Sequence, residues 1–388
     1  MNKVKYFNLY GSTGQIGSKS LQIIDRYFPS IKINLLVANT NYKKLLKQAI
    51  SYKPKFISIN DESKIKHLKK NINNKETKII DSSELFHLIK SSKSDISILA
   101  ISGYKSLEYL TSIFHNTNTL GIVNKECIVS AGHLFHKINK KNKTKIFPLD
   151  SEHYSLKSLY RLCNYDELKK IYITASGGPF FKNKFSEIKN ISFKQAKNHP
   201  KWKMGYKNSI DSATLVNKCL ELIEAHYLFN LPYDKLRMLI HPEALVHSII
   251  EYNNYTSVMN YFYHDMYIPL FNFFSDTINE KNYPISNNNY DFKKNSSLNF
   301  YKPNLKQFPI LNIFNEIEKS PINLIKFNCA NEFAVNLFAE KKINFGNIHK
   351  IIANSLSLDF NSQVNNVKNI IDFQNNFIEI LKSKFLKL

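Results

Sequence analysis

The chain has 388 residues, a formal net charge of +23 and 43% hydrophobic residues. This length suggests roughly two to three domains, and no apolar run approaches the roughly 18 residues that a membrane span needs. All the basic residues are lysines apart from Arg26, Arg161 and Arg237, although arginine is the preferred base reader and bidentate phosphate binder. The dispersed lysines therefore indicate a compositional bias, not a nucleic-acid or membrane surface, and their positive field would help to gather anionic substrates.

The cysteines and the start of the chain indicate the compartment. The first predicted strand begins at Val4, so we expect no signal or transit peptide. The cysteines are far apart and form no CxxC pair, which argues against a zinc ribbon or a disulfide framework and favours a reducing compartment. We therefore expect a cytoplasmic protein with unpaired thiols at Cys127, Cys163, Cys219 and Cys329.

Residues 1–150 alternate apolar strands with amphipathic helices such as 18–27 and 42–52. This alternation predicts an α/β fold with a parallel, doubly wound, Rossmann-like sheet. The predicted strands are 4–10, 33–38, 56–59, 96–101, 120–123 and 145–148.

The rest of the chain predicts three further regions. Residues 151–285 mix strands and helices, residues 286–310 are polar and read as a linker, and residues 311–388 are helical. The pattern therefore predicts a doubly wound N-terminal region, a second α/β region and a C-terminal helical region. The predicted strands are 170–175, 238–240 and 244–252, and the predicted helices are 212–228, 330–340, 348–358 and 367–381.

A glycine turn follows the first predicted strand. Gly11-Ser-Thr-Gly-Gln-Ile-Gly17 leads into a helix, where glycines let the backbone approach a pyrophosphate and the helix N-terminus offers free N–H groups. The alternative is a simple tight turn. No acid follows the next predicted strand within 37–41, and Lys43 and Lys44 come directly afterwards. NADP is therefore favoured over NAD, because nothing there repels a 2′-phosphate.

Two carboxylates come directly after a predicted strand, at Asp150 and Glu152. In extended backbone, residues i and i+2 point to the same side, so both carboxylates would converge on one cation. Hard oxygen ligands suit Mg²⁺ or Mn²⁺. The alternative is a surface loop or helix cap that happens to carry two acids.

A second polar group lies on a predicted helix that starts at Asp211 and Ser212, both good helix-start residues. Asn217, Lys218 and Glu221 are spaced to share one helix face. A helix N-terminus with these side chains can hold a phosphate, and Glu221 can supply a third carboxylate to a metal. The alternative is an exposed face with a local Lys–Glu pair.

Two further loops carry candidate residues. Thr174–Pro179 is a small-residue turn whose backbone and Ser176 hydroxyl could approach an anion, or an ordinary loop. The segment 199–205 holds Trp202, the single tryptophan, and ends in glycine. It predicts a lid that packs over a ligand, or a loop anchored to the core by its indole.

The order and spacing of these motifs resemble the 1-deoxy-D-xylulose 5-phosphate reductoisomerase family. The resemblance covers most of the chain and is weakest at 286–310 and in the last 50 residues. It is carried by GSTGQIG (11–17), NKE (124–126), LDSEH (149–153), TASGGPF (174–180), HPKWKMG (199–205), DSATLVNKCLELIEA (211–225), IHPEALVHS (240–248) and NCANEFAV (328–335).

The resemblance implies roles at matching positions. Metal ligands would be Asp150, Glu152 and Glu221. The reacting end of the substrate would meet Lys125, Ser151, Glu152 and His199, and its phosphate would meet Ser176, Ser212, Asn217 and Lys218. Trp202 and Met204 would belong to the lid. NADPH would contact Thr13, Gly14, Gln15, Ile16, Asn39, Thr40, Asn41, Asn124, Glu126 and Gly205.

The resemblance also implies the chemistry. A metal would grip the carbonyl and adjacent hydroxyl oxygens, a carbon–carbon bond would break and re-form, and NADPH would reduce the resulting aldehyde to 2-C-methyl-D-erythritol 4-phosphate. The family's architecture implies an NADPH-binding domain at 1–150, a catalytic and metal-binding domain at 151–285 and a C-terminal helical domain at 311–388. The family is usually homodimeric, and its reaction belongs to non-mevalonate isoprenoid precursor biosynthesis. This chain departs from common family residues at 39–40, at Tyr206 in place of a basic residue, and at 264–267.

Two other classes of protein compete with this interpretation. A semialdehyde or glyceraldehyde-phosphate type of NADP dehydrogenase needs a thiolate nucleophile, and only Cys219 lies near a predicted motif, facing away from 217, 218 and 221. A nucleic-acid-binding protein is suggested by charge alone and predicts tight, salt-sensitive binding.

Overall fold

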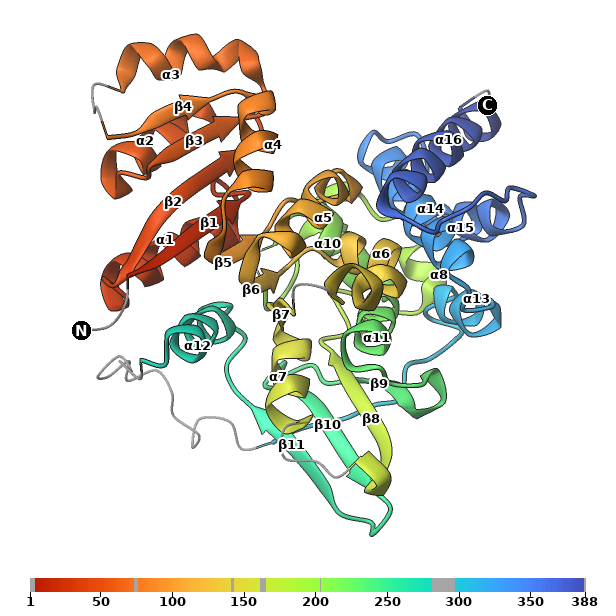
Figure 1. Cartoon of the computed structure of the whole chain (residues 1–388). Helices are drawn as coiled ribbons and strands as arrows, with labels where there is room; N and C mark the ends of the chain where they lie inside the picture. The colour runs from red at the N-terminus through yellow and green to blue at the C-terminus, as the bar shows by residue number, and fades with distance from the viewer. Residues whose placement is uncertain are drawn as a thin grey trace. The chain divides into compact units, whose positions relative to one another are not determined.

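A computed structural model of the chain describes residues 4–72, 76–140, 143–160, 165–202, 204–280 and 297–386. The chain forms two compact units (Figure 1). The first comprises Met1–Asn124, Phe135–Asp150 and Asp265–Asn289, and the second comprises Lys125–Leu134, Ser151–His264 and Tyr290–Leu388. In the described part of the chain, no helix is both long and apolar enough to cross a membrane.

The first unit is built on a seven-stranded sheet in the order β4-β3-β2-β1-β5-β6-β7, with every neighbouring pair parallel. The predicted Rossmann-like sheet is thereby confirmed. The strand order reverses at β1, which lies between β2 and β5. Open parallel sheets bind their ligands at such a reversal point, beyond the carboxyl ends of the strands. The strands are β1 (Lys5–Tyr10), β2 (Ile31–Ala38), β3 (Phe56–Ile59), β4 (Lys78–Ile80), β5 (Ser94–Leu99), β6 (Thr117–Ile122) and β7 (Lys145–Pro148).

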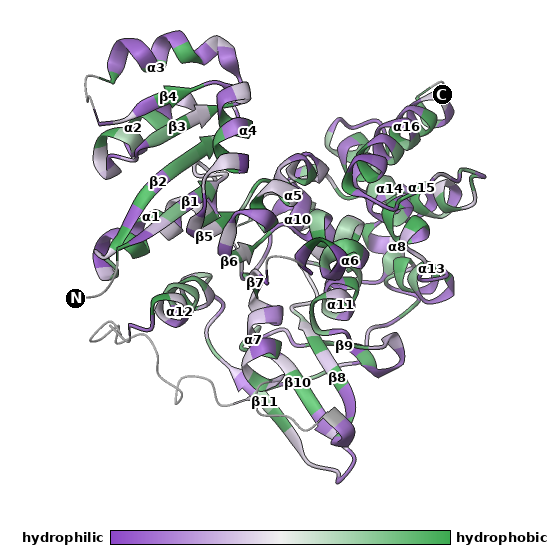
Figure 2. Ribbon diagram, viewed as in Figure 1, coloured by the Kyte–Doolittle hydropathy of each residue, from purple (hydrophilic) through white to green (hydrophobic). Residues whose placement is uncertain are grey.

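Hydrophobic residues concentrate in the strands, while α3 is largely hydrophilic (Figure 2). A distant segment, α12 (Tyr267–Ile278), packs in this unit because its aromatic rings fill the core. Phe274 meets Phe7 edge-on at 5.5 Å between ring centroids, and Phe273 meets Phe147 at 5.1 Å. The other helices are α1 (Gln15–Tyr27), α2 (Tyr42–Tyr52), α3 (Ile65–Asn71), α4 (Ser82–Ser91), α5 (Leu107–His115) and α6 (Lys125–Asn139), of which α6 begins in the second unit.

The second unit contains a four-stranded sheet in the order β11-β10-β8-β9. β10 (Val246–Tyr252) pairs antiparallel with β11 (Ser257–Tyr261) and with β8 (Leu168–Ala175), while β9 (Leu236–Ile240) runs parallel to β8. Two helices pack on this sheet, α7 (Ser151–Tyr160) against β10 and α11 (Val216–Phe229) against β8 and β9. The short helices α8 (Phe185–Ile188) and α9 (Phe193–Lys197) precede α10 (Tyr206–Thr214).

The helix predicted at 212–228 is two helices, so that prediction is corrected. Leu215 has φ of 65° and lies in the left-handed region, which interrupts the hydrogen-bonded ladder between α10 and α11. Its side chain is fully buried, and burial holds this unfavourable backbone in place. Ser212 therefore lies in the last turn of α10, and the helix N-terminus next to Asn217 and Lys218 is that of α11.

Among the described residues, the second unit has four further α-helices. α14 (Pro321–Ala339) starts with Ser320 as its N-cap and packs against α15 (Ile348–Leu356) and α16 (Val367–Phe385). α13 (Ile310–Glu316) packs against α11. The predicted helices fall within or close to these elements. Residues 286–296 of the predicted linker lie outside the described residues, and the division of 151–388 into separate catalytic and helical domains stays a prediction.

Protonation of Glu332 on α14 links stability to pH. Burial raises the pKa of Glu332 to about 7, opposed by Lys207 and reinforced by Glu126 and Asp211. Because the folded-state pKa exceeds the unfolded value of about 4.3, stability falls as pH rises between these values and is constant above about 7. We expect Glu332→Gln to raise the free energy of unfolding by roughly 2 kcal/mol at about pH 8 and by less than about 1 kcal/mol at about pH 5. Urea titrations at both pH values measure this, and an equal gain at both would contradict the assignment.

Candidate active site

The glycine turn lies at the reversal point of the first sheet. A Cβ on Gly11, whose φ is +91°, would lie 2.5 Å from the Ala100 carbonyl oxygen at the end of β5. A Cβ on Gly17 would lie 2.4 Å from the Gly11 oxygen, so this glycine lets α1 start directly against the turn. The Gln48 amide donates to the Ser12 carbonyl oxygen at 2.8 Å and fixes the turn from α2. The predicted strand, turn and helix are confirmed here.

The other predicted cofactor residues of the first unit surround the ends of its strands. Asn41 caps α2 by accepting from the Lys44 N–H at 3.1 Å. The Asn124 amide donates to the carbonyl oxygens of Ile101 and Gly103, the second at 3.1 Å. The remaining ones are half-buried or exposed, and they are Thr13, Gly14, Gln15, Ile16, Asn39 and Thr40.

Two glycines of the turn give a matched pair of variants. Gly17→Ala places a methyl group against backbone atoms that cannot move aside, with contacts of 2.4 to 2.7 Å. Gly14→Ala meets only the Gly11 oxygen at 3.3 Å. We expect Gly17→Ala to cost about 2–3 kcal/mol of stability, as overpacking does, and Gly14→Ala less than about 1 kcal/mol. Unfolding without nucleotide measures both, and equal losses would contradict this packing of the turn.

Three carboxylates converge in the structure. Asp150, Glu152 and Glu221 each offer an oxygen atom, and these atoms lie within 4.8 Å of one another. The expected extended backbone is wrong: α7 begins at Ser151, so Glu152 lies in its first turn and Asp150 directly precedes it. Asp150 is the residue directly before α7, Glu152 is the second residue of α7, and Glu221 belongs to α11. An all-oxygen donor set of three acids fits Mg²⁺ or Mn²⁺.

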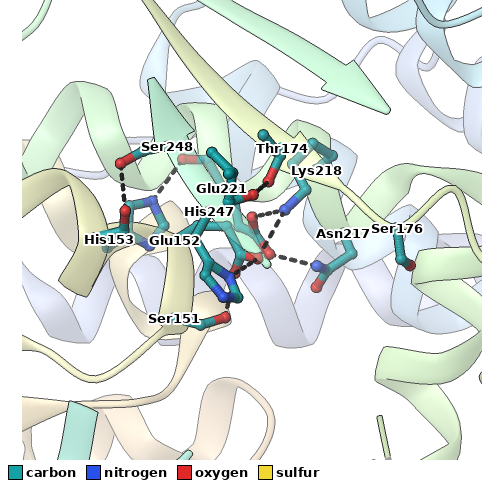
Figure 3. Close-up of polar contacts among 12 residues, drawn as sticks. Ser151, Glu152, His153, Thr174, Ser176, Asn217, Lys218, Glu221, His247 and Ser248 are labelled. Carbon is teal, nitrogen blue, oxygen red and sulfur yellow. Dashed lines mark hydrogen bonds and ion pairs between the residues drawn. The ribbon is translucent and has the colours of Figure 1, made fainter. Parts of the chain in front are cut away.

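The Glu221 side chain is 1% exposed, and the side chains of Lys218 and Asn217 point toward its carboxylate (Figure 3). Lys218 donates to Oε2 of Glu221 and lies 3.7 Å from Oε1 of Glu152, while the Asn217 amide donates to Oε1 of Glu221. Lys125 donates to the same Oε1 at 3.1 Å. Asn217, Lys218 and Glu221 therefore share one face of α11 as predicted. The two ammonium groups offset the cost of burying this carboxylate.

Sequence reasoning assigned no role to three buried residues beside these acids. His247 on β10 lies 3.3 Å from Oε1 of Glu152 through Nδ1 (Figure 3). His153 holds the Glu221 backbone oxygen at 2.9 Å through Nε2. Glu224 lies 3.5 Å from Lys125 Nζ. Glu224 could have been predicted from the sequence, because it lies one helical turn after Glu221. For His247, the only indication in the sequence was its position in a family motif.

The predicted phosphate and lid residues line one pocket in the second unit. Gly178, with φ of +68°, allows the turn after β8 to approach α10, because a Cβ there would lie 2.8 Å from the Ser212 oxygen. Ser176 and Ser212 thereby meet in the same pocket, although they are distant in sequence. Its lining includes Glu152, Ser176, His199, Trp202, Met204, Ser212, Asn217 and Lys218.

His199 has a defined proton position. Its Nδ1 accepts from the backbone N–H groups of Lys201 and Trp202, at 3.1 and 2.9 Å. The ring proton therefore lies on Nε2, which donates to Ser176 Oγ at 3.0 Å. Burial lowers the pKa of His199 to about 4, although Glu152 opposes the shift. A neutral imidazole thus ties the predicted lid to the turn after β8.

The Trp202 indole is half-buried over the pocket. Its ring lies edge-on to the rings of His264 and His247, at 5.8 and 6.4 Å between centroids. Apolar contact of this kind suits a residue that closes over a ligand and excludes water.

Comparisons with known proteins identify the family of the chain. Residues 7–132 match the model of 1-deoxy-D-xylulose 5-phosphate reductoisomerase, and residues 146–229 and 263–379 match models of C-terminal domains of the same enzyme. The chain is 36% identical over 381 residues to 1-deoxy-D-xylulose 5-phosphate reductoisomerase of Sulfurihydrogenibium sp., covering 97% of this chain and 98% of the relative. It is 38% identical over 349 residues to that of Pelagibacter ubique, covering 89% of each.

Solved structures give the same result. The Zymomonas mobilis reductoisomerase in complex with NADPH matches with a TM-score of 0.86 and 28% identity over all of both chains. A reductoisomerase in complex with NADPH, fosmidomycin and magnesium matches with a TM-score of 0.85 and 29% identity over 98% of each. A Rossmann-like sheet, together with three clustered acids whose oxygen atoms suit a divalent metal, indicates the class of metal-dependent oxidoreductases. Within that class, the chain belongs to the 1-deoxy-D-xylulose 5-phosphate reductoisomerase family.

Proposed function

We propose that the chain converts 1-deoxy-D-xylulose 5-phosphate and NADPH to 2-C-methyl-D-erythritol 4-phosphate, with a divalent metal, in non-mevalonate isoprenoid precursor biosynthesis. The observation that carries this proposal is the convergence of Asp150, Glu152 and Glu221 beside a pocket lined by Ser176 and Lys218. Relatives with the same named activity cover nearly the whole chain. Reductoisomerase structures that contain NADPH, magnesium and the inhibitor fosmidomycin support the same chemistry.

The carboxylates would hold Mg²⁺ or Mn²⁺. When bound, the metal supplies Lewis acidity to the substrate's carbonyl and neighbouring hydroxyl oxygens. Lys125 and Ser151 would meet the same end of the substrate. Their contacts support this proposal, because Lys125 donates to Glu221 and Ser151 donates to Glu152 at 2.7 Å. These contacts fix the acids before substrate arrives, as preorganised sites require.

The other end of the pocket would hold the phosphate. The Lys218 ammonium, the Asn217 amide and the hydroxyls of Ser176 and Ser212 are donors suited to phosphate oxygens. The N-terminus of α11 beside them adds a positive dipole end. Trp202 and Met204 would close over the substrate backbone. His199, which is proposed to contact the reacting end of the substrate, would also hold that lid through its bond to Ser176. Binding the remote phosphate positions the reacting carbons.

NADPH would bind to the glycine turn, with its pyrophosphate at the N-terminus of α1. Asn39, Thr40 and Asn41 would lie near the ribose 2′-phosphate, where no carboxylate would repel it. Asn124, Glu126 and Gly205 would complete the cofactor site. The hydride would go to the aldehyde that the rearrangement produces.

A thiolate-dependent NADP dehydrogenase is the rival class. The Cys219 thiol is fully buried on α11, and burial raises its pKa above the usual range. A neutral, buried thiol is a poor nucleophile. Metal dependence separates the two classes, because thiolate chemistry needs no divalent ion.

We also propose a homodimer in the cytoplasm that binds neither nucleic acid nor membrane. The small-molecule pocket and the dispersed lysines support this assignment, and the resemblance implies the dimer. Sedimentation at micromolar concentration distinguishes a dimer from a monomer of 45.2 kDa.

Product analysis tests the rearrangement itself. The chain is incubated with ¹³C-labelled 1-deoxy-D-xylulose 5-phosphate, NADPH and Mg²⁺, and the product is examined by carbon NMR. We expect a branched carbon skeleton in the product. A straight-chain polyol phosphate would show reduction without rearrangement and would overturn the proposal.

A further inference from the structure

A buried ammonium group links two carboxylates in the second unit. Lys207 Nζ lies 3.0 Å from Oε1 of Glu126 and 2.7 Å from Oδ2 of Asp211. The side chains are 17%, 8% and 1% exposed in that order. Burial disfavours the charges, but pairing outweighs it, so the pKa of Lys207 is raised and that of Glu126 is lowered. Screening by salt is weak for charges that are buried to this degree.

Each carboxylate is next in sequence to a predicted site residue. Glu126 follows Lys125, whose ammonium donates to Oε1 of Glu221 at 3.1 Å. Asp211 precedes Ser212, which lines the pocket at the phosphate end. One ammonium group therefore joins the segment that carries Lys125 to the helix that carries Ser212.

α14 holds the same helix from another direction. The Asn331 amide donates to Oδ1 of Asp211 at 2.9 Å, and both side chains are fully buried. The Tyr206 hydroxyl donates to Oδ1 of Asn336 at 3.0 Å. The two bonds join opposite halves of α10 to α14, with the two helices running antiparallel. Together they fix the position of α10 against α14 at two points. Tyr206, which stands in place of a common basic residue, thus supplies one of the anchors.

We propose that Lys207 is a positioning residue that sets the separation between Lys125 at the reacting end and Ser212 at the phosphate end. This inference rests on the function proposed above. A substrate gripped at both ends tolerates little misplacement, and a shift of about 1 Å can cost about 100-fold in rate. Without the ammonium, Glu126 and Asp211 repel each other, and both ends of the pocket lose their spacing.

Kinetics of three lysine variants test this role. Lys326→Met is the matched control, because Lys326 is a second buried lysine of the same unit, and it donates to the Leu358 carbonyl oxygen at 2.9 Å. We expect Lys207→Met to lower kcat/KM for 1-deoxy-D-xylulose 5-phosphate by about 100-fold or more, through a lower kcat and a higher KM for this substrate. Lys207→Arg, which keeps the charge, should recover to within about tenfold. Lys326→Met should stay within about threefold of the wild type.

Hydrogen exchange gives a readout that is independent of turnover. Amides of residues 125–129 and 206–214 should exchange faster in Lys207→Met and not in Lys326→Met. A wild-type chain that turns over no substrate would refute the proposed function. Unchanged exchange in both segments of Lys207→Met would refute the positioning role, whatever the substrate.

Three kinetic outcomes would overturn the inference. One is a folded Lys207→Met with wild-type kcat and KM, and another is an equal loss in Lys326→Met. If Lys207→Met does not fold, Asp211→Asn decides, because it keeps the Lys207–Glu126 pair and removes one charge. We expect that variant to lose about tenfold in kcat/KM or more, and kinetics within about threefold of wild type would overturn the role.

Discussion

Glu221→Gln is expected to lower kcat by about 1,000-fold or more, because a metal-binding carboxylate contributes several kcal/mol of transition-state stabilisation. Glutamine keeps the size of the side chain but loses the charge that binds the cation. It also leaves Lys125 and Lys218 without the carboxylate that each contacts at Glu221. NADPH binding should remain, since the glycine turn belongs to the first unit. Turnover with varied Mg²⁺ and NADPH fluorescence titration measure the two effects separately.

The matched control is Glu251→Gln on β10 of the same unit. Glu251 accepts from Lys169 and Tyr172 at 2.8 Å and belongs to none of the predicted sites. This variant should keep kcat within about twofold of wild type, as exposed ion pairs contribute little. Near-normal turnover of Glu221→Gln would remove Glu221 from the metal site.

Lys218→Ala is expected to raise KM by about 10- to 100-fold with a smaller change in kcat. A charged hydrogen bond to phosphate is worth about 1.5–3 kcal/mol, and Lys218 lines the predicted phosphate end of the pocket. Steady-state kinetics with 1-deoxy-D-xylulose 5-phosphate measure this change.

A substrate analogue without phosphate provides the control for Lys218. Wild type and Lys218→Ala should use that analogue equally poorly, because the lost contact is absent for both. An unchanged KM for the full substrate would remove Lys218 from the phosphate grip. A loss in kcat alone would place its main effect on Glu221, which it also contacts.

Most of the first sheet was predictable because its buried parallel strands are short, continuous apolar runs. The predicted strands 56–59 and 145–148 and the helix 42–52 coincide with β3, β7 and α2. β4 was missed because it has three residues, and β11 because its side chains are half-buried or exposed and give no clear apolar pattern. Such edge strands are determined by pairing, which a single sequence does not display.

The candidate site was predicted in composition and less well in geometry. The motifs identified the acids and the phosphate donors. The break between α10 and α11 at Leu215 could not be predicted, because no glycine or proline marks it in the sequence. The convergence of Asp150 and Glu152 was predicted from a strand, whereas a helix start produces it. The role of Lys207 could not be found from sequence, because its partner Glu126 is far away along the chain and only folding brings the two together. The same holds for Asn331, which donates to Asp211, the other partner of Lys207.

The most direct test of the central claim follows NADPH absorbance with 1-deoxy-D-xylulose 5-phosphate, first with Mg²⁺ or Mn²⁺ and then with EDTA. We expect oxidation of NADPH that requires substrate and metal, stops with EDTA and returns when metal is restored. NADPH that binds but is not consumed with either metal would contradict the assigned reaction. Consumption that EDTA leaves unchanged would contradict the site of Asp150, Glu152 and Glu221.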